Sequence, residues 1–422
     1  MLNVSRIREN KDEIIQSLSK KGFNNSTIIN DIITADNDRK SIQKQLDDIL
    51  SESNIIAKTI AELYKNKQVE EANDYKNKSL KLKDISKELN EKLKQTEDKL
   101  TDLLIKVPNV PHKDVPSGKS AEDNVIVTSY GEIPSLQNKV PHWELTQKYD
   151  LINFELGNKI TGAGFPLYKD KGAKLQRALI NFFIDEASEN GYTEYLPPLL
   201  VNQESAYATG QLPDKDGQMY FVNEDNLYLI PTAEVPITNI HRDVIYRKEE
   251  LPIKNVAYSA CFRREAGSYG KDVRGLNRLH QFDKVEIVQI VEPENSYKVL
   301  DEMVEYVSSL LKKLNLPFRV LRLCGGDLSF TSALTYDFEV YSAGQEKWLE
   351  VSSVSNFEDY QANRLKLRMK DGNSKATILH TLNGSALALP RIMASIIENN
   401  YTNDGINIPE CLTKYTSFNK IN

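Results

Sequence analysis

Apolar and small side chains recur in the first quarter of the chain at alternating steps of four and three residues. Between residues 28 and 63 the positions of this series are Ile28, Ile32, Ala35, Arg39, Ile42, Leu46, Ile49, Ser53, Ile56, Ile60 and Leu63. This spacing is a heptad pattern, which places one stripe of a helix against a partner helix. The pattern predicts one long helix with a buried stripe.

A second series with the same spacing follows a short polar stretch at residues 65–71. Its positions are Ala72, Tyr75, Ser79, Leu82, Ser86, Leu89, Leu93, Thr96, Leu100 and Leu103. Neither series contains Pro. Two heptad helices joined by a short link predict an antiparallel coiled coil, with helices of about 36 residues that are each roughly 54 Å long. We therefore predict an N-terminal arm over residues 1–105.

The tip of this arm carries local positive charge. Residues 65–83 contain six Lys against three acidic side chains, an excess of three. A charged run is often only a solvated helix face, and the alternative is a surface that contacts an RNA backbone through charge and shape. Charge alone leaves both interpretations open. The candidate RNA-binding residues of the arm are Lys65, Lys67, Lys76 and Lys78.

The heptads stop at residue 106, where KVPNVPHKDVPSGKS brings three Pro into fifteen residues. Pro interrupts helices, so we predict a linker over 106–130 and a second domain over 131–422. In that domain, helical stretches at 173–189, 295–315 and 391–400 alternate with strand-like runs at 285–291, 318–323 and 337–343. The body is therefore predicted to be of the α+β class.

Composition narrows the functional classes. The chain has 422 residues, 40% of them hydrophobic and 27% charged, with a net charge of -6. Without a general basic excess, any contact with nucleic acid must come from local patches, and we expect no DNA partner. The three Cys residues are far apart, which argues against a zinc site or a disulfide framework. No apolar run reaches about 18 residues, so we expect no membrane partner and a cytoplasmic location.

The clearest chemical signal lies between residues 261 and 287, since the body lacks both a P-loop and a Rossmann glycine motif. A strand-like start, a Gly-rich basic loop and a second strand predict a hairpin. In an extended strand, Arg263 and Glu265 would point to the same face. They could simply pair with each other. Alternatively, Arg263 holds a phosphate and Glu265 accepts from an adenine amino group, while Phe282 stacks on the base.

Four further segments share their features with one known family. Together with the hairpin, residues 194–213, 229–238, 348–364 and 381–399 resemble bacterial and organellar seryl-tRNA synthetases in sequence and order, over nearly the whole chain. The resemblance implies a class II synthetase fold, an antiparallel sheet flanked by helices with an N-terminal antiparallel coiled-coil arm. The segment ending in Pro197 and Pro198 resembles motif 1 of that class, which implies a homodimer.

The same resemblance implies an ATP site. Arg263 would contact the α-phosphate and Arg391 the γ-phosphate, and both are the expected catalytic residues. Glu265 would bind the adenine amino group and Phe282 the ring, while Arg264 stands where the family most often has Ser. Further expected ATP-binding residues are Glu350, Val351, Ser352 and Ser353, of which Glu350 and Ser353 are also the expected Mg²⁺ ligands.

The resemblance also implies a serine pocket, in which carboxylates hold the ammonium group and polar side chains bind the hydroxyl. Its expected members are Thr232, Ala233, Glu234, Arg263, Glu286, Asn383 and Ser385. From the strand pattern alone, Glu286 would be interpreted as a solvent-facing residue. The arm is expected to pack along the long variable arm of tRNA(Ser), with Lys271 and Arg274 of the hairpin loop as further tRNA contacts. A second candidate acceptor is tRNA(Sec).

The activity implied is that of a ligase forming a carbon–oxygen bond. L-Serine and ATP would give seryl-adenylate and diphosphate, and serine would then be transferred to the 3′ end of the tRNA. Two other functions remain as alternatives: a non-catalytic RNA-binding protein, and a ligase that loads an amino acid onto a carrier protein. The full set of phosphate, adenine and pocket residues disfavours the first, and the long arm disfavours the second.

Overall fold

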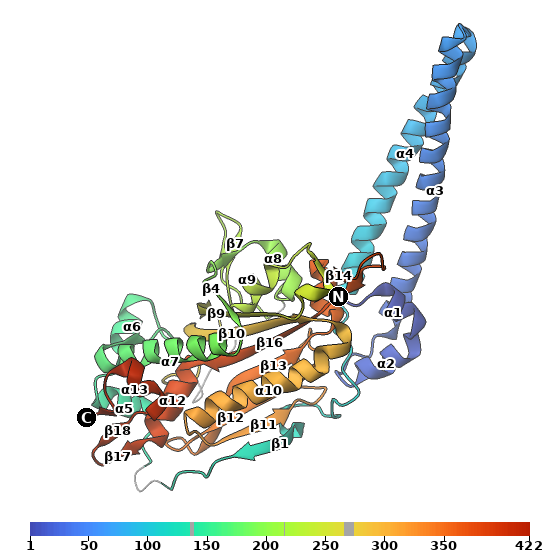
Figure 1. The fold of residues 1–422 in the computed structure, drawn as a ribbon. Helices are drawn as coiled ribbons and strands as arrows, with labels where there is room; N and C mark the ends of the chain where they lie inside the picture. Colours follow the sequence, from blue (N-terminus) through green and yellow to red (C-terminus); the bar gives the residue numbers. More distant parts are fainter. Residues whose placement is uncertain (136–138, 215, 266–273) are drawn as a thin grey trace. The chain divides into compact units, whose positions relative to one another are not determined.

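The computed structural model describes residues 1–135, 139–214, 216–265 and 274–422. It contains two compact units (Figure 1). One comprises Met1–Ser19 and Phe23–Pro108, and the other comprises Lys20–Gly22 and Asn109–Asn422. None of the helices in these described ranges is long and apolar enough to cross a membrane.

The first unit is helical and contains the predicted coiled coil. Its helices are α1 (Val4–Glu9), α2 (Lys11–Ser19), α3 (Ser26–Lys65) and α4 (Val69–Leu104). Helices α3 and α4 run side by side along their length (Figure 1). Seam positions such as Ile32, Leu46, Leu82 and Leu89 are buried, and the remaining positions of both heptad series are at least partly buried. The coiled-coil prediction is therefore confirmed.

The connection between α3 and α4 is shorter than the predicted link of residues 65–71. Only Asn66–Gln68 separate the two helices, and Lys67 adopts a positive φ of 62°. Glu70 and Glu71 belong to the first turn of α4, where negative charge is favourable beside unpaired N–H groups. A polar sequence therefore does not by itself end a helix.

One buried charge joins two helices of this unit. Asp36 of α3 is 3% exposed and forms ion pairs with Arg8 of α1 (2.6 Å), Arg39 (2.9 Å) and Lys40 (2.8 Å). Burial alone would raise the pKa of Asp36, but hydrogen bonds from Lys40, Arg39 and Arg8 lower it to about 2. Three cationic side chains thus stabilise the Asp36 carboxylate, whose burial the heptad pattern does not explain.

The second unit is built on an eight-stranded sheet with the strand order β1-β11-β12-β13-β16-β10-β9-β4. All neighbouring pairs are antiparallel except β4 and β9, which are parallel. The strands are β1 (Val125–Tyr130), β4 (Thr193–Tyr195), β9 (Ile253–Phe262), β10 (Gln281–Val291), β11 (Phe318–Arg322), β12 (Leu334–Ser342), β13 (Lys347–Asn356) and β16 (His380–Ala388). The predicted strand runs all lie in this sheet, which confirms the fold class.

Helices and four small sheets surround these strands. The helices are α5 (His142–Lys148), α6 (Phe154–Ile160), α7 (Asp170–Glu189), α8 (Gln203–Thr209), α9 (Glu234–Asn239), α10 (Ser296–Lys313), α11 (Asp359–Leu365), α12 (Leu389–Asn399) and α13 (Glu410–Thr416). The small sheets contain β2 (Ile152–Asn153), β3 (Leu167–Tyr168), β5 (Leu200–Val201), β6 (Phe221–Val222), β7 (Leu227–Leu229), β8 (Ile245–Arg247), β14 (Arg368–Lys370), β15 (Thr377–Ile378), β17 (Tyr401–Thr402), β18 (Gly405–Asn407) and β19 (Lys420–Ile421).

Alternation along the central strand β10 separates the main core from the other face of the sheet. Val285 and Ile287 belong to the large core cluster that also includes residues of α7, α10 and α12. Val288 instead packs with Ala233 and Ile237 on and beside α9. Because successive side chains of a strand point to opposite faces, Glu286 lies on the same side of β10 as Val288, the side of α9. The polar residues discussed below lie on that side.

The predicted linker, residues 106–130, contains ordered elements of this unit. Asn109 is fully buried, and its amide donates to the carbonyls of Thr331 (2.9 Å) and Phe357 (2.8 Å). Farther along, residues 125–130 form β1, the exposed outer strand of the sheet. The β-branched run Val125–Val127 carries the strand signal, which the neighbouring Pro residues obscured.

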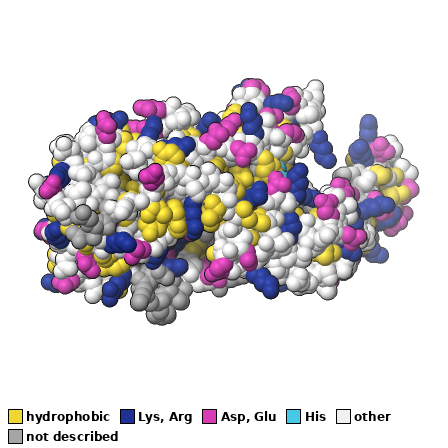
Figure 2. All heavy atoms as spheres, turned by 90° about the horizontal axis from the view of Figure 1, so that it is seen from below, with side chains coloured by type: hydrophobic (Ala, Val, Ile, Leu, Met, Phe, Trp, Pro, Cys, Tyr) yellow, Lys and Arg dark blue, Asp and Glu magenta, His cyan; other side chains and the backbone are white. Residues whose placement is uncertain are grey.

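Charges of both signs are scattered over the face shown in Figure 2, with hydrophobic side chains between them. This is the distribution expected from nearly equal numbers of basic and acidic residues. A binding site for an anionic partner must therefore come from a local group of basic side chains, not from the overall charge of this face.

Candidate active site

The hairpin predicted at residues 261–287 is present as β9 and β10, which pair from Ile253 with Ile290 to Phe262 with Gln281. The prediction for Arg263 and Glu265 was wrong in one respect. Strand β9 ends at Phe262, and Glu265 has a positive φ of 49°, so the two residues do not share an extended strand. Glu265 pairs with Arg278 of the returning segment (3.0 Å), not with Arg263.

Arg263 lies between the two strands and the segment that leads into α9. Its backbone N–H donates to the carbonyl of His280 (2.9 Å), and its Nε donates to the carbonyl of Pro231 (3.3 Å). The guanidinium carbon is 5.2 Å from the centre of the Phe282 ring, a cation–π distance. Arg264 is exposed, and its backbone N–H donates to the carbonyl of Gln218 (2.8 Å).

A buried polar cluster surrounds Glu286, which is 1% exposed. The hydroxyl of Thr232 donates to Oε2 (2.8 Å), the amide of Asn383 donates to Oε1 (2.5 Å), and Lys284 forms an ion pair with Oε2. Ser385 pairs with Glu286 across β16 and β10. The sheet therefore brings together four of the predicted pocket residues, Thr232, Glu286, Asn383 and Ser385.

Glu234 is the second carboxylate on this side of the sheet. It is 7% exposed and accepts from the amide of Gln361 (2.7 Å). Burial and the nearby charge of Glu286 raise its pKa from 4.5 to about 7, and Lys284 and Arg263 oppose this shift. Ala233, the remaining predicted pocket residue, is fully buried against Val288. The charges of two buried acidic side chains thus interact, and titratable groups perturbed in this way are typical of functional sites.

Strands β12 and β13 bring further oxygen atoms together. Asp337 is the register partner of Ser353, and an irregularity in the pairing lies between Phe338 and Glu339. Burial and the charge of Glu350 raise the pKa of Asp337 well above its usual value, whereas a hydrogen bond with Ser353 lowers it. The Ser352 hydroxyl instead donates to the carbonyl of Ser385 (2.6 Å), and Val351 is part of the core. Of the predicted set, Glu350 and Ser353 therefore lie near a common carboxylate.

Arg391 is held close to these strands. It lies in the first turn of α12, which begins at Leu389 with Pro390 beside it, a favourable position for Pro. Its Nη1 donates to the carbonyl of Glu350 (2.6 Å), and its Nε donates to the carbonyl of Asn277 (3.1 Å). The two predicted arginines thus approach the same sheet from different elements.

The candidate RNA-binding residues are spread over both units. Lys65, Lys67, Lys76 and Lys78 are exposed in the first unit, where Lys78 forms a surface ion pair with Glu52 (3.0 Å). In the second unit Arg274 is exposed. Lys271 lies outside the described residues.

Three site residues were missed in the sequence. Lys284 contacts Glu286, Gln361 contacts Glu234, and Asp337 lies beside Glu350. Lys284 could have been found, because it stands two residues before Glu286 on the same strand and must face the same side. Gln361 and Asp337 carried no comparable signal, since their partners are 127 and 13 residues distant.

An antiparallel sheet with acidic side chains on its strands, one arginine directly after β9 and another in the first turn of α12 is the arrangement of class II aminoacyl-tRNA synthetases. Residues 220–400 match the family described as "tRNA synthetase class II core domain (G, H, P, S and T)". Residues 1–111 match the "Seryl-tRNA synthetase N-terminal domain".

The chain belongs to the seryl-tRNA synthetase family. It is 47% identical to a serine–tRNA ligase of Salinibacter ruber over 424 residues, which cover 100% of this chain and 99% of that protein. It is 43% identical to the serine–tRNA ligase of Chlorobium chlorochromatii, with 100% of both chains covered. The structure of seryl-tRNA synthetase from Pyrococcus horikoshii complexed with ATP is similar with a TM-score of 0.90 and 32% identity, over 100% of this chain and 99% of that one.

Proposed function

We propose that this protein is a serine–tRNA ligase, which activates L-serine with ATP to seryl-adenylate and transfers serine to the 3′ end of tRNA(Ser). The observation that carries the proposal is the buried polar cluster around Glu286, whose oxygens accept from Thr232 and Asn383. It lies on the same face as Glu234 and close to Arg263. Relatives that match over their full length bear the name serine–tRNA ligase.

The pocket suits a small amino acid that carries one hydroxyl. Glu286 and Glu234 supply negative charge for the ammonium group, and Thr232, Asn383 and Ser385 supply hydrogen-bonding groups. A pocket that hydrogen-bonds a hydroxyl rejects an analogue without it, because its own polar groups are left unpaired. Alanine is excluded for this reason, and threonine must be excluded by the limited volume of the pocket.

Adenylate formation needs positive charge rather than a protein nucleophile. When the serine carboxylate attacks the α-phosphorus, the phosphorus–oxygen bond to diphosphate breaks and negative charge grows on the phosphate oxygens. Arg263 at the α-phosphate and Arg391 at the γ-phosphate stabilise this charge by position. Phe282 stacks on adenine, and Glu265 accepts from the adenine amino group. Arg264 adds a further positive charge. Val351 and Ser352 would contribute backbone atoms of β13, because the Val351 side chain is in the core and the Ser352 hydroxyl bonds to the Ser385 carbonyl.

The side chains beside Arg391 fit Mg²⁺. Asp337, Glu350 and Ser353 offer the oxygen ligands that this ion prefers, and Asp337 Oδ1 is buried without a hydrogen-bond partner among the described residues. No three His, Cys, Asp or Glu side chains of the described ranges form a complete metal-binding group. Mg²⁺ commonly takes its other ligands from water and phosphates. Glu350 and Ser353 would hold the ion, which supplies charge neutralisation at the phosphates.

The acceptor RNA is assigned to the arm. Lys65, Lys67, Lys76 and Lys78, with Lys271 and Arg274 of the hairpin loop, are the proposed contacts with the phosphate backbone of tRNA(Ser). A solved structure of A. aeolicus tRNASec in complex with M. kandleri SerRS is 18% identical in sequence to this chain. At that identity it supports only the fold, so tRNA(Sec) remains a second candidate acceptor.

Exposed apolar residues support the proposal of a homodimer. After β4, Leu196 is 83% exposed and Leu199 40%. Together with Pro197, Pro198 and Ile240 they line or border one hollow. Apolar side chains with this exposure commonly lie in protein interfaces, and this segment is the one that resembles motif 1. A second copy of the chain is the proposed partner.

Exchange of labelled diphosphate into ATP tests the activation step directly. With Mg²⁺ and each of the twenty amino acids, we expect exchange with serine alone, and its loss in Arg263→Ala. Exchange with a different amino acid would contradict the pocket assignment and retain the class of ligase. No exchange by the folded protein would favour the non-catalytic RNA-binding alternative.

A further inference from the structure

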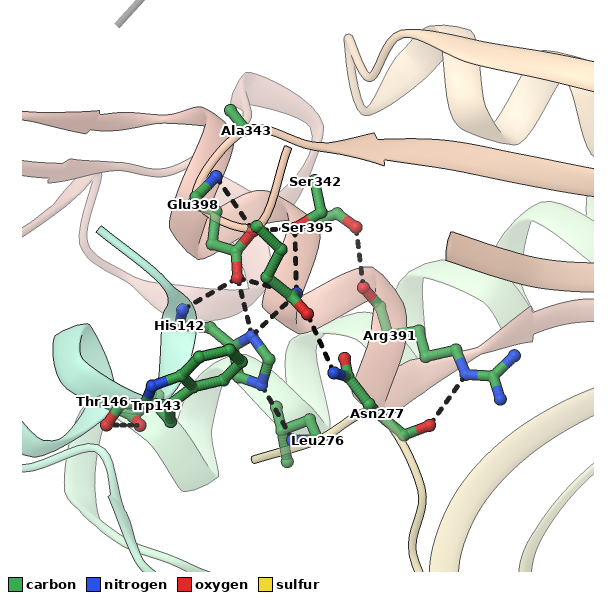
Figure 3. Close-up of polar contacts among 12 residues, drawn as sticks. His142, Trp143, Thr146, Leu276, Asn277, Ser342, Ala343, Arg391, Ser395 and Glu398 are labelled. Atoms are coloured by element: carbon green, nitrogen blue, oxygen red, sulfur yellow. Dashed lines mark hydrogen bonds and ion pairs between the residues drawn. The ribbon is translucent and has the colours of Figure 1, made fainter. Parts of the chain in front are cut away.

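A buried carboxylate with several hydrogen-bond donors lies outside the proposed substrate pocket. Glu398, in the last turn of α12, is fully buried. Its Oε1 accepts from the backbone N–H of His142 (2.8 Å), from His142 Nδ1 (2.7 Å) and from the amide of Gln345 (3.0 Å). Its Oε2 accepts from the Ser342 hydroxyl and from the backbone N–H of Gly344 (3.2 Å). Figure 3 shows the central part of this network.

These contacts hold Glu398 in its ionised form. Burial alone would raise the pKa of Glu398, but the hydrogen bonds from His142 and from the Ser342 hydroxyl bring it below its usual value. Apolar residues of similar volume would stabilise this core at least as well as a buried carboxylate. The contacts of Glu398 are therefore better explained by a role in fixing the positions of the groups around it.

His142 uses both of its ring nitrogens. Nε2 accepts from the backbone N–H of Leu276 (2.8 Å), so the ring proton is on Nδ1 and is donated to Glu398. Both groups of the His142–Glu398 pair are fully buried. The pair therefore fixes one tautomer of the ring and, through it, the position of the Leu276 peptide.

The backbone around Leu276 is shaped to this ring. Gly275 has a φ of 63°, and a Cβ at that position would lie 2.2 Å from His142 Nε2. A side chain is excluded there both by the positive φ and by the contact. The segment Gly275–Asn277 belongs to the return of the hairpin loop, separated by three residues from the start of β10 at Gln281.

From this segment the network continues to the phosphate-binding arginine. Arg391 Nε donates to the carbonyl of Asn277 (3.1 Å), as Figure 3 shows. The Asn277 amide donates to Gln345 Oε1 (2.9 Å), and the amide of Gln345 in turn donates to Glu398. Asn277 is thus tied to Glu398 by two routes, and its carbonyl fixes one corner of the Arg391 guanidinium. The Glu350 carbonyl fixes a second corner.

We propose that His142 and Glu398 are positioning residues for ATP, which set the Gly275–Asn277 backbone and, through the Asn277 carbonyl, the orientation of Arg391. The inference rests on the proposed function only in that Arg391 binds the phosphates of ATP. Serine binding does not pass through this network, because Glu286 contacts Thr232, Lys284 and Asn383 instead.

Two variants break the relay at different points. His142→Phe keeps a ring of similar size and removes the acceptor for the Leu276 N–H. Gly275→Ala leaves the buried pair in place and pushes the loop away from His142, so it tests the relay if His142→Phe does not fold. His142→Gln retains an amide that can accept from Leu276. Ser395→Ala is the matched control, because its hydroxyl donates only within α12 to the Arg391 carbonyl (2.9 Å).

Calorimetric binding of ATP without an amino acid is the first measurement, and diphosphate exchange is the second. We expect His142→Phe and Gly275→Ala to weaken ATP binding about tenfold, with the KM for serine changed less than about twofold. His142→Gln should recover part of the loss, and Ser395→Ala should match the parent protein. In an Arg391→Ala background, His142→Phe should have little further effect, since residues that act through one another are not additive.

The inference is overturned if His142→Phe and Gly275→Ala lower the melting temperature while ATP affinity and exchange stay unchanged. Independent, multiplying effects of His142→Phe and Arg391→Ala would overturn it as well. The proposed function fails separately, when the parent protein binds ATP but shows no exchange with serine. In that case the calorimetric comparison still decides the role of His142.

Discussion

The arm and the substrate pocket are stabilised by contacts of different range. In α3 and α4 the buried and partly buried seam positions follow one another at steps of three or four residues along the same helix. In the pocket, Glu286 is held by Thr232, 54 residues earlier, and by Asn383, 97 residues later. The free energy of folding of the arm is distributed over many similar contacts, whereas each contact in the pocket holds one particular side chain in place. Single substitutions should therefore have small effects in the arm and large ones in the pocket.

The charged side chains of the two regions differ in their exposure to solvent. The tip lysines are exposed, and Lys78 interacts with Glu52 where water and salt screen the pair. Lys284 and Glu286 are 7% and 1% exposed, so their charges are screened much less. Removing one member of the buried pair leaves the other without a counter-ion.

The largest expected effect comes from removing the arm as a whole. Deletion of residues 28–103 should reduce tRNA charging by on the order of a thousandfold or more, because phosphate contacts dominate the affinity for RNA. Serine-dependent exchange should remain largely intact, since none of the proposed ATP or serine residues lies in that range. Both activities are to be measured on one preparation. Survival of charging would show that the arm is not the RNA-binding element.

Within the pocket, Glu286→Gln should lower kcat/KM for serine about a thousandfold, on the order of 4 kcal/mol. The substitution removes the charge that faces the ammonium group and strands Lys284 in a buried site. Exchange kinetics at varied serine and a thermal melt separate the two consequences.

The double variant Glu286→Gln with Lys284→Met is the control for the stranded charge. It should recover thermal stability without recovering the use of serine. If the double variant exchanges diphosphate normally, the loss in Glu286→Gln arose from misfolding, and Glu286 does not bind the substrate.

A smaller effect is expected in the pH dependence of stability at Glu234. Its pKa is raised from 4.5 to about 7. Its stabilising contribution is complete below pH 4.5, where it is protonated in both the folded and the unfolded chain, and is lost as the pH rises to about 7. The shift corresponds to on the order of 3 kcal/mol. Glu234→Gln cannot titrate, so the stability of this variant relative to the parent should rise over that interval. Denaturant titrations at several pH values check this, and a constant difference would contradict it.

The arm was predicted from the sequence more completely than the pocket, because its contacts join residues that are close together in the sequence. The heptads of the arm are a local pattern, so its helices were predicted to within a few residues. Strand β10 was also clear from its apolar run. The exposure of Glu286 could not be read from that run, because the face it occupies depends on strand pairing with β16. Only the resemblance to a known family favoured a substrate role for this residue.

The same reason accounts for what was missed. Glu265 was placed in a strand because nothing in the local pattern shows that β9 ends at Phe262. The network of His142 and Glu398 joins residues 256 positions apart, and Asp337 lies beside Glu350 only through the pairing of β12 and β13. Such groups become visible only when the register of the sheet is known.

The smallest expected effects are at the tip of the arm, and they test whether its charge has a function. Replacing Lys65, Lys67 and Lys76 together by Ala should weaken tRNA binding about tenfold at low salt. The slope of log affinity against log salt should fall by roughly 0.7 to 0.9 for each lost phosphate contact. Lys78→Ala should have the weakest effect of the single substitutions, because Lys78 is already paired with Glu52.

Affinity measured over a range of salt concentrations distinguishes a phosphate contact from a solvated face. Glu52→Gln is the matched control, because it releases Lys78 and should steepen the salt dependence slightly. If the triple variant binds tRNA with the parent's affinity and salt slope, these lysines only form a hydrated helix surface and do not contact RNA. The arm would then contact RNA through its shape and through other residues along α3 and α4.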